Sequence, residues 1–293
     1  MRTSLIYNPT AGNGKAAALY SQLRPQMESF GVEVFQTQGP RHAIELARTF
    51  ADDPNRTVIS LGGDGTHHEV INGLMPSGKA IFSVIPAGTG NDFVRVLDYP
   101  NDPEAILQTA LHGTPRPIDV GQAGNEYFLT VSGIGFDAEV AAWVNHRAKA
   151  GSGRSVFLRG ILYNLLFYRS QAVSVMMDDR AAETRDSFLL AGGNTAYYAS
   201  GMQICPGASI HDGTLTVVWI ERLSRLEVLP MLLRVLQGRH LGHVRVRSAE
   251  VRKLTVDGPQ ELQVHADGEI IGHLPITLRA LPNAIRVRMG KPN

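Results

Sequence analysis

The sequence is short of cysteine, of net charge and of long hydrophobic runs. Cys205 is the one cysteine among 293 residues, which excludes an internal disulfide framework and a cysteine-rich zinc site. The formal net charge is +1 and no nucleic-acid-binding motif is present, so we expect no nucleic acid partner. No apolar stretch approaches the roughly 18 residues that a membrane span requires, and the first residues lack a secretory signal pattern. These absences predict a cytoplasmic protein.

Strands and helices alternate through the first 120 residues. Four short apolar runs predict buried strands, at residues 3–7, 32–37, 56–61 and 80–85. Three stretches with helical spacing lie between them, at residues 15–30, 41–50 and 66–74, and Pro25 should kink or divide the first. The alternation predicts an α/β domain over residues 1–120, with an open, mainly parallel sheet covered by helices.

The pattern changes after Pro117. Short strands joined by turn residues follow one another, and helical stretches interrupt them only near residues 137–169 and 224–237. This pattern predicts a second domain over residues 121–293 that is largely antiparallel β, with the last residues free to return to the first domain.

Glycine-rich loops follow the strands of the first domain. They read NPTAGNGK (residues 8–15), TQGPRHA (37–43), GGDGT (62–66) and PAGTGNDFVR (86–95). A glycine turn between a strand and a helix presents backbone N–H groups and a positive helix end, which together favour phosphate. Because parallel strands end at the same edge of a sheet, the loops predict one nucleotide polyphosphate site.

The first loop shares features with two standard nucleotide motifs. Pro9 and Ala16 stand where a Walker loop needs glycine and a hydroxyl residue, so it is not a Walker loop. Gly12, Gly14 and Ala17 satisfy a dinucleotide fingerprint, with Glu33 about 20 residues on. That fingerprint leaves GGDGT and GTGND unexplained, so an NAD(P)-dependent oxidoreductase remains as an alternative.

Five segments together resemble a known family. NPTAGNGK, GGDGTHHEVING, PAGTGNDFVR, PGASIHDGTLTV and HADGE are similar to segments of bacterial lipid kinases of the diacylglycerol kinase catalytic-domain family, which includes sphingosine and ceramide kinases. The resemblance runs in order from residue 5 to about residue 270. It implies a nucleotide-binding α/β domain, a β-sandwich domain and an active site in the cleft between them. It also implies ATP- and Mg²⁺-dependent phosphorylation of a lipid hydroxyl, with diacylglycerol as leading acceptor and phosphatidic acid as product.

The resemblance also assigns roles to individual residues. The residues expected against ATP are Asn8, Thr37, Gly63, Asp64, Gly65, Thr66, His67, His68, Glu69, Thr89 and Asn91. Asp64, Asp92 and Asp119 match acidic positions that organise catalytic Mg²⁺. Asp212 would bind a second, structural metal, with carbonyl oxygens from Ser209 and Thr214. His211 stands where many relatives have another acid, which leaves occupancy of that loop open.

Asp267 of HADGE matches the proposed general base, acting together with Asp64. An acceptor hydroxyl is weakly acidic, and a positioned carboxylate that takes its proton contributes about 10² to 10⁴ in rate. Asp267 also precedes Gly268 directly, and an Asp-Gly pair is a common hairpin turn. Both interpretations remain open from the sequence, as does a non-catalytic lipid or nucleotide sensor that lacks a working base.

Residues 143–169 carry basic and aromatic side chains and no acid. Such a stretch can contact anionic lipid, and it can equally be a core helix with a solvated basic face. With the resemblance we expect transient, peripheral membrane contact here, and a homodimer is a further expectation.

Other polar residues are less informative. His67 and His68 are expected on the surface of a first helical turn, and Cys205 as a packed thiol. Asp137 of SGIGFDAEV is a candidate for acceptor recognition, with a helix N-terminal acid as the alternative.

Overall fold

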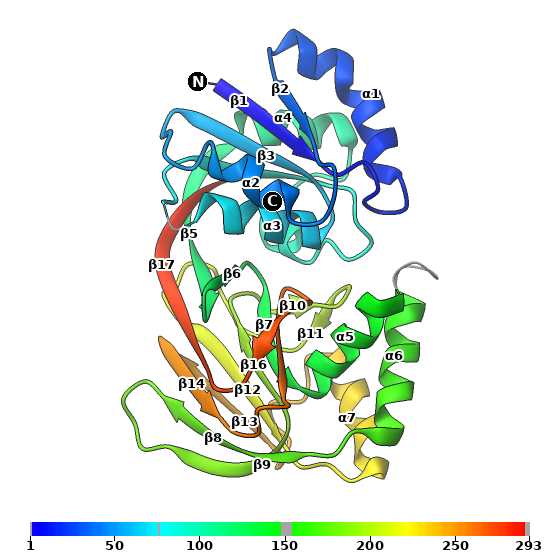
Figure 1. The fold of residues 1–293 in the computed structure, drawn as a ribbon, viewed down its shortest axis with the longest axis vertical. Helices are drawn as coiled ribbons and strands as arrows, with labels where there is room; N and C mark the ends of the chain where they lie inside the picture. The colour runs from blue at the N-terminus through cyan, green and yellow to red at the C-terminus, as the bar shows by residue number, and fades with distance from the viewer. Residues whose placement is uncertain (1, 76, 148–153, 291–293) are drawn as a thin grey trace. The chain divides into compact units, whose positions relative to one another are not determined.

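The computed structural model describes residues 2–75, 77–147 and 154–290. The chain divides into two compact units. Unit 1 comprises Met1–Ile118 and Asn283–Asn293, and unit 2 comprises Asp119–Pro282. Two strands belong in part to each unit, β5 (Thr114–Ala123) and β17 (Ile276–Met289) (Figure 1).

Unit 1 is built on a parallel sheet of five strands in the order β2-β1-β3-β4-β17. The first four are β1 (Arg2–Tyr7), β2 (Glu33–Gln36), β3 (Arg56–Gly62) and β4 (Ile81–Pro86). Every residue of β3 is buried, as expected for a central strand with both faces covered. The end of β17 adds the fifth strand, with Val287 paired to Phe82. The predicted parallel α/β domain is confirmed.

Helices pack against this sheet. They are α1 (Lys15–Ser29), α2 (His42–Arg48), α3 (Asp64–Leu74) and α4 (Pro103–His112), with the 3₁₀ turn η1 (Phe93–Val96). Pro25 lies inside α1 without dividing it. The alternation did not predict α4, although its start has a clear signal. Asp102 accepts a hydrogen bond from the Ala105 N–H at 2.9 Å, and Pro103 occupies the first turn.

Arg288 fixes the end of β17 within unit 1. Its side chain is buried and donates to the Gly113 carbonyl at 2.6 Å and to Thr57 Oγ1 at 3.1 Å. The Tyr99 hydroxyl donates to the Arg288 carbonyl at 3.0 Å. Burial of these polar groups is tolerated because they hydrogen-bond to one another.

Unit 2 is largely antiparallel, as predicted. Its principal sheet has the order β16-β15-β7-β9-β8-β14-β17, and β12 pairs with β9 and β13. The strands are β6 (Glu126–Phe128), β7 (Val131–Gly135), β8 (Gln171–Met177), β9 (Glu183–Gly193), β12 (Leu215–Glu221), β13 (Val246–Val251), β14 (Lys253–Asp257), β15 (Gln263–Ala266) and β16 (Glu269–His273). The short strands β10 (Tyr197–Tyr198) and β11 (Met202–Gln203) form a separate hairpin.

Three helices gather on one side of unit 2 (Figure 1). They are α5 (Phe136–Arg147), α6 (Arg154–Phe167) and α7 (Arg225–Leu236), within the two predicted helical stretches. A core cluster joins all three helices to the sheet through Val140, Ile161, Met231, Phe188 and Ile220. A second cluster of buried residues in this unit includes Trp219 and Phe128.

Candidate active site

Unit 1 gathers three of the predicted loops at the carboxyl edge of its sheet. The loops after β3 and β4 meet through two glycines, because a Cβ on Gly88 would lie 2.6 Å from the Cα of Gly63. The loop after β1 approaches the same point, since a Cβ on Gly12 would collide with the Ala87 carbonyl. Gly12 also has a φ of 61°, which favours glycine. These positions therefore need glycine for close backbone contact.

Asp64 joins two of these loops. Its Oδ1 accepts the Asp92 N–H at 2.9 Å, and Asp92 is itself buried and lies 3.3 Å from the guanidinium of Arg95. Asn91 closes the same loop by accepting the Gly88 N–H at 3.0 Å. The structure thus brings the predicted residues Asp64, Asn91 and Asp92 together.

Helix α3 begins at Asp64, directly after β3, and its N-cap residue is Gly63, which has no side chain to occupy the N–H groups of the first turn. These N–H groups and the positive helix end lie at the loop cluster, which suits an anion. Asn8 reaches this turn, with Nδ2 at 3.5 Å from Thr66 Oγ1. Thr37 follows β2 and is buried, whereas Thr89 is exposed in the loop after β4.

Three residues expected against ATP have other contacts. His67 and His68 are buried, so their predicted surface placement is wrong. The helix turns His67 toward β3, where its Nδ1 lies 2.8 Å from Ser60 Oγ, and His68 lies against Asn72. Glu69 accepts the N–H groups of Arg41 and Ala43, at 2.9 and 3.2 Å. Its carboxylate therefore caps α2, a role that the sequence did not predict.

Glu33 does not support the dinucleotide interpretation. It begins β2 instead of ending it, and its carboxylate lies 2.6 Å from Arg56. Arg56 holds the pKa of the Glu33 carboxyl below its usual value through this hydrogen bond. A ribose-binding acid belongs at the carboxyl end of that strand.

In unit 2, Asp267 occupies the turn between β15 and β16. Asp267 and Gly268 have φ angles of 51° and 90°, so the Asp-Gly hairpin turn is present. The carboxylate accepts three hydrogen bonds, from the N–H groups of Leu129 and Thr130 and from the Thr130 hydroxyl, at 2.9, 2.8 and 2.6 Å. Asp267 is therefore half-buried with a fixed orientation.

Asp119 belongs to the same hydrogen-bonded network. The Asn194 side chain donates to the carbonyls of Asp119 and Leu129, at 3.1 and 2.9 Å, and is fully buried. Asn194 thus connects the strand of Asp119 to the segment that holds Asp267. Asn194 was not predicted, because nothing in its local sequence distinguishes it from a turn residue.

Asp119 also contacts the predicted metal loop. Its Oδ2 accepts the Gly213 N–H at 2.6 Å. Asp212 Oδ1 accepts from the N–H and hydroxyl of Thr214, both at 2.9 Å, and Ser209 Oγ accepts the His211 N–H at 3.3 Å. Asp119, Ser209, Asp212 and Thr214 therefore lie in one part of unit 2.

The carboxylates of the two predicted metal sites are suitable ligands for Mg²⁺. Within the ranges that the structure describes, no group of three or more His, Cys, Asp or Glu residues is placed to hold a metal. Mg²⁺ usually takes one or two protein carboxylates and completes its shell with water and substrate phosphate. Asp64 and Asp92 of unit 1 fit that requirement as oxygen donors, as does Asp212 of unit 2. Asp119, which was predicted to act with Asp64 and Asp92, belongs to unit 2 and accepts the Gly213 N–H.

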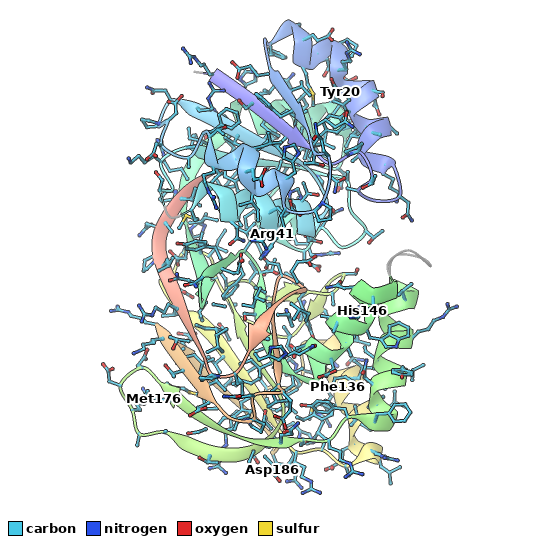
Figure 2. The ribbon with its side chains drawn as sticks, in the orientation of Figure 1. Tyr20, Arg41, Phe136, His146, Met176 and Asp186 are labelled. Carbon is cyan, nitrogen blue, oxygen red and sulfur yellow. The ribbon has the colours of Figure 1, made fainter. Side chains whose placement is uncertain are left out.

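Unit 2 also contains an apolar cavity beneath α5, α6 and α7. Its empty volume is about 480 Å³, including space open to solvent. Phe136, which is labelled in Figure 2, lies at the start of α5. It contributes to the cavity wall and stacks on Phe188, with 4.6 Å between the ring centroids. Apart from Asp137 and the hydroxyl of Tyr198, the wall is apolar, and it includes Val140, Ile161, Ile204, Ile220, Val228, Met231, Leu232 and Val235.

Asp137 and Cys205 are both buried in this unit. Asp137 lies 3.2 Å from His265 Nε2. Burial raises the pKa of the Cys205 thiol well above its usual value, so the predicted packed thiol is confirmed and a thiolate nucleophile is disfavoured.

Comparison with known proteins decides the family. Residues 2–123 match the diacylglycerol kinase catalytic domain, and residues 130–289 match the YegS C-terminal NAD kinase beta sandwich-like domain. The chain belongs to the diacylglycerol kinase family of lipid kinases. It is thus a phosphotransferase with an alcohol group as acceptor, and the predicted family is confirmed.

Individual relatives agree with this family over nearly the whole chain. A diacylglycerol kinase of Bacillus subtilis is 29% identical over 296 residues, covering 99% of this chain and 97% of its own. A diacylglycerol kinase structure from Bacillus anthracis superposes with a TM-score of 0.79 at 24% identity, over 99% of this chain and 97% of that chain. An NAD kinase from Archaeoglobus fulgidus shares the fold more distantly, with a TM-score of 0.58 at 14% identity and coverage of 98% and 93%.

Proposed function

We propose that this lipid kinase transfers the γ-phosphoryl group of ATP to diacylglycerol in a Mg²⁺-dependent reaction, and releases phosphatidic acid. The observation that carries the proposal is the loop cluster of unit 1, where bare glycine backbone, the start of α3 and the Asp64 carboxylate meet. Such a cluster suits the triphosphate of a nucleotide that carries a divalent cation.

Positioning and charge neutralisation account for most of the catalysis of phosphoryl transfer. Backbone N–H groups of residues 63–65 would orient the phosphates, since the Thr66 N–H donates to the Gly63 carbonyl. Asp64 and Asp92 would hold Mg²⁺. The bound Mg²⁺ supplies neutralisation of the charge on the transferring phosphoryl group. The close packing of Gly63 on Gly88 keeps the surface low enough for the phosphates to approach the backbone.

Asp267 would act on the acceptor. Three hydrogen bonds fix its carboxylate, so a lipid hydroxyl bound to either oxygen would be held in one orientation. As the hydroxyl oxygen bonds to phosphorus, its proton would pass to the carboxylate. The bond from the γ-phosphorus to the bridging oxygen breaks, and ADP leaves with that oxygen.

The cavity of unit 2 supports a lipid as acceptor. Ligand sites of small molecules commonly have mostly apolar walls with few polar groups, and the wall of this cavity is of that kind. An acyl chain is the part of diacylglycerol that such a wall would bind.

Peripheral membrane contact through residues 143–169 remains part of the proposal. Leu162, Tyr163 and Phe167 are exposed large hydrophobic residues of α6, and Arg159 on the same helix is exposed. Residues 148–153 of this stretch lie outside the described residues. No helix in the described ranges is long and apolar enough to cross a membrane. Replacing Arg154 and Arg159 by Glu should weaken binding to anionic vesicles, while ATP binding is retained.

The experiment that tests the function uses the purified chain, γ-labelled ATP, Mg²⁺ and a total lipid extract. Label in phosphatidic acid is the expected result. Label in another phospholipid would replace diacylglycerol as the acceptor, and absence of label from every lipid would overturn the proposed activity. Stabilisation by NADH or NADPH but not by MgATP would contradict ATP as the phosphoryl donor.

A further inference from the structure

Helix α7 is apolar on two opposite faces. Val228, Met231 and Val235 are buried and line the cavity of unit 2. The opposite face carries Leu226, Leu229 and Leu233, with 89%, 56% and 53% of their surface exposed. Because successive helical residues turn by about 100°, positions 226, 229 and 233 fall on one stripe. We name these three leucines, with Pro230 between them, the α7 leucine stripe.

Basic residues surround the leucine stripe. At the same rotation per residue, Arg225 falls on one side of the stripe and Arg234 on the other. Residues 222–247 contain one acid, Glu227, and six arginines, Arg222, Arg225, Arg234, Arg239, Arg245 and Arg247. Glu227 accepts the Ser224 N–H at 2.7 Å as part of the capping box, and lies 4.0 Å from Arg245. Three of these arginines lie in ion pairs, Arg222 with Asp186, Arg245 with Glu227 and Arg247 with Glu221. The basic residues that flank the stripe on the helix itself are Arg225 and Arg234.

The size of the stripe argues against a stable protein interface as its main purpose. Its three leucines together expose about as much surface as two fully exposed leucine residues. A stable protein interface buries about 800 Å² on each partner. An apolar stripe with arginines on both sides is instead typical of a helix that lies in a membrane interface.

We propose that α7 binds an anionic bilayer surface, with the leucine stripe among the upper acyl chains and the flanking arginines at the headgroups. This proposal rests on the lipid kinase activity proposed above. Since the inner face of α7 lines the cavity, the same helix would contact the bilayer on one side and a bound lipid chain on the other. The contact site is separate from the stretch at residues 143–169.

The test measures binding to vesicles by co-sedimentation. Leu229→Gln combined with Leu233→Gln removes two leucines that do not line the cavity. Phe30→Gln combined with Val34→Gln is the matched control, because these unit 1 residues are 47% and 38% exposed. We expect the α7 variant to bind phosphatidylcholine–phosphatidylglycerol vesicles about tenfold more weakly than wild type, and the control to bind within twofold.

Further measurements distinguish the membrane contact of α7 from the kinase activity. Phosphorylation of short-chain diacylglycerol dispersed in detergent should be unchanged in the α7 variant. Loss of vesicle binding without loss of this activity supports α7 as the membrane contact. Vesicle binding equal to wild type would overturn the proposal. The proposal would also be overturned if sedimentation velocity shows that the wild type is a dimer and the variant a monomer, while both bind vesicles equally. If the wild type binds vesicles but phosphorylates no lipid, the proposed kinase activity is wrong and the proposed membrane contact of α7 still holds.

A second inference concerns a buried pair beside the Asp267 turn. His265 and Asp137 have only 2% and 1% of their side chains exposed, and His265 Nε2 lies 3.2 Å from Asp137 Oδ2. The Gly268 N–H donates to His265 Nδ1 at 3.3 Å. Because Nδ1 accepts, the imidazole hydrogen is on Nε2 and is donated to Asp137. Gly133 leaves room for the pair, since a Cβ there would collide with both side chains.

We infer that His265 is a positioning residue for Asp267. It holds the N–H of Gly268, the residue directly after Asp267, while Asp137 fixes the imidazole tautomer and orientation. Such a third group beside a catalytic side chain acts through orientation instead of contacting the substrate. This role differs from acceptor recognition by Asp137, and it follows from the hydrogen bonds alone.

Two substitutions separate the two hydrogen bonds of His265. His265→Asn keeps an acceptor near the Nδ1 position, whereas His265→Gln keeps a donor near Nε2. We expect the Gln variant to lose about tenfold in kcat with KM for MgATP within twofold, and the Asn variant to recover most of the rate. His240→Gln is the control, because His240 is equally buried in unit 2 but its Nε2 lies 3.0 Å from the Ile204 carbonyl. Equal kcat for the Asn and Gln variants, or an equal loss in the control, would overturn the inference.

Discussion

Units 1 and 2 supply their parts of the chemistry in different ways. Unit 1 uses backbone, in glycines that touch at Gly63 and Gly88 and in the start of α3. Unit 2 uses side chains, in the network from Asp119 through Asn194 to Asp267 and in an apolar cavity. Backbone sites need particular residue types at fixed spacing, whereas side-chain networks join residues far apart in the chain. The comparison predicts nucleotide defects from unit 1 variants and acceptor defects from unit 2 variants.

The largest expected effect is that of Asp267→Asn in unit 2. An amide keeps the size of the carboxylate but cannot take the proton of the acceptor, so kcat should fall by about 10² to 10⁴. MgATP affinity, measured by calorimetry, should stay within twofold of wild type, because its binding residues are in unit 1. A parallel loss of MgATP affinity and kcat would contradict the division of roles between the units.

A methyl group added in the loop cluster of unit 1 should weaken MgATP binding, in contrast to the Asp267 variant. The Cβ of Gly88→Ala would lie 2.6 Å from the Cα of Gly63, so the backbone must move. We expect MgATP binding to weaken about tenfold or more, because phosphate contacts depend on backbone position. Gly39→Ala adds the same methyl group to the loop after β2, where no atom of the described residues lies within 4 Å. Near-normal affinity for Gly39→Ala and weak affinity for Gly88→Ala would support the backbone role of unit 1, and equal affinities would contradict it.

Magnesium should stabilise unit 2 through the loop of Asp212. A cation that binds the folded state at 100 times its Kd contributes about 2.7 kcal/mol. Thermal unfolding of the wild type should therefore shift upward with added Mg²⁺, and EDTA should reverse the shift. Asp212→Asn should remove most of it. An Mg²⁺ shift of equal size in this variant would show that the loop of Asp212 does not hold the ion.

The smallest effect is expected for Cys205. Burial raises the pKa of its thiol, so a thiol reagent at neutral pH should not label the native protein and should label it after unfolding. Cys205→Ser should leave kcat unchanged and lower the free energy of unfolding by about 1–3 kcal/mol, because a hydroxyl is costly in an apolar site. Fast labelling of the native state would contradict the packed thiol.

Much of unit 1 was predictable from the sequence, since strand and helix periods alternate there and glycine loops follow the strands. Helix α4 was missed, although Asp102 and Pro103 mark its start. The burial of His67 and His68 was missed because the apolar pattern of the helix does not show whether two adjacent residues in its first turn are buried. His67 contacts Ser60 of β3, His68 contacts Asn72, and both rings are buried.

Less of unit 2 was predictable. The strands and the turn at Asp267 follow from local pattern, but the partners of Asp267 are more than 130 residues away in the chain. Asn194 and the pair of Asp137 and His265 likewise depend on strand register, which a single sequence does not specify. The cavity could not be predicted because its apolar residues have the same composition as a core.

Donation of the γ-phosphoryl group of MgATP to diacylglycerol is the step on which the proposed function depends. The most direct test is to incubate the purified protein with MgATP and a defined diacylglycerol, and to measure ADP and phosphatidic acid together. We predict that the two products form in equal amounts. ADP release without any phosphorylated lipid, or no product from either substrate, would contradict the proposed transfer.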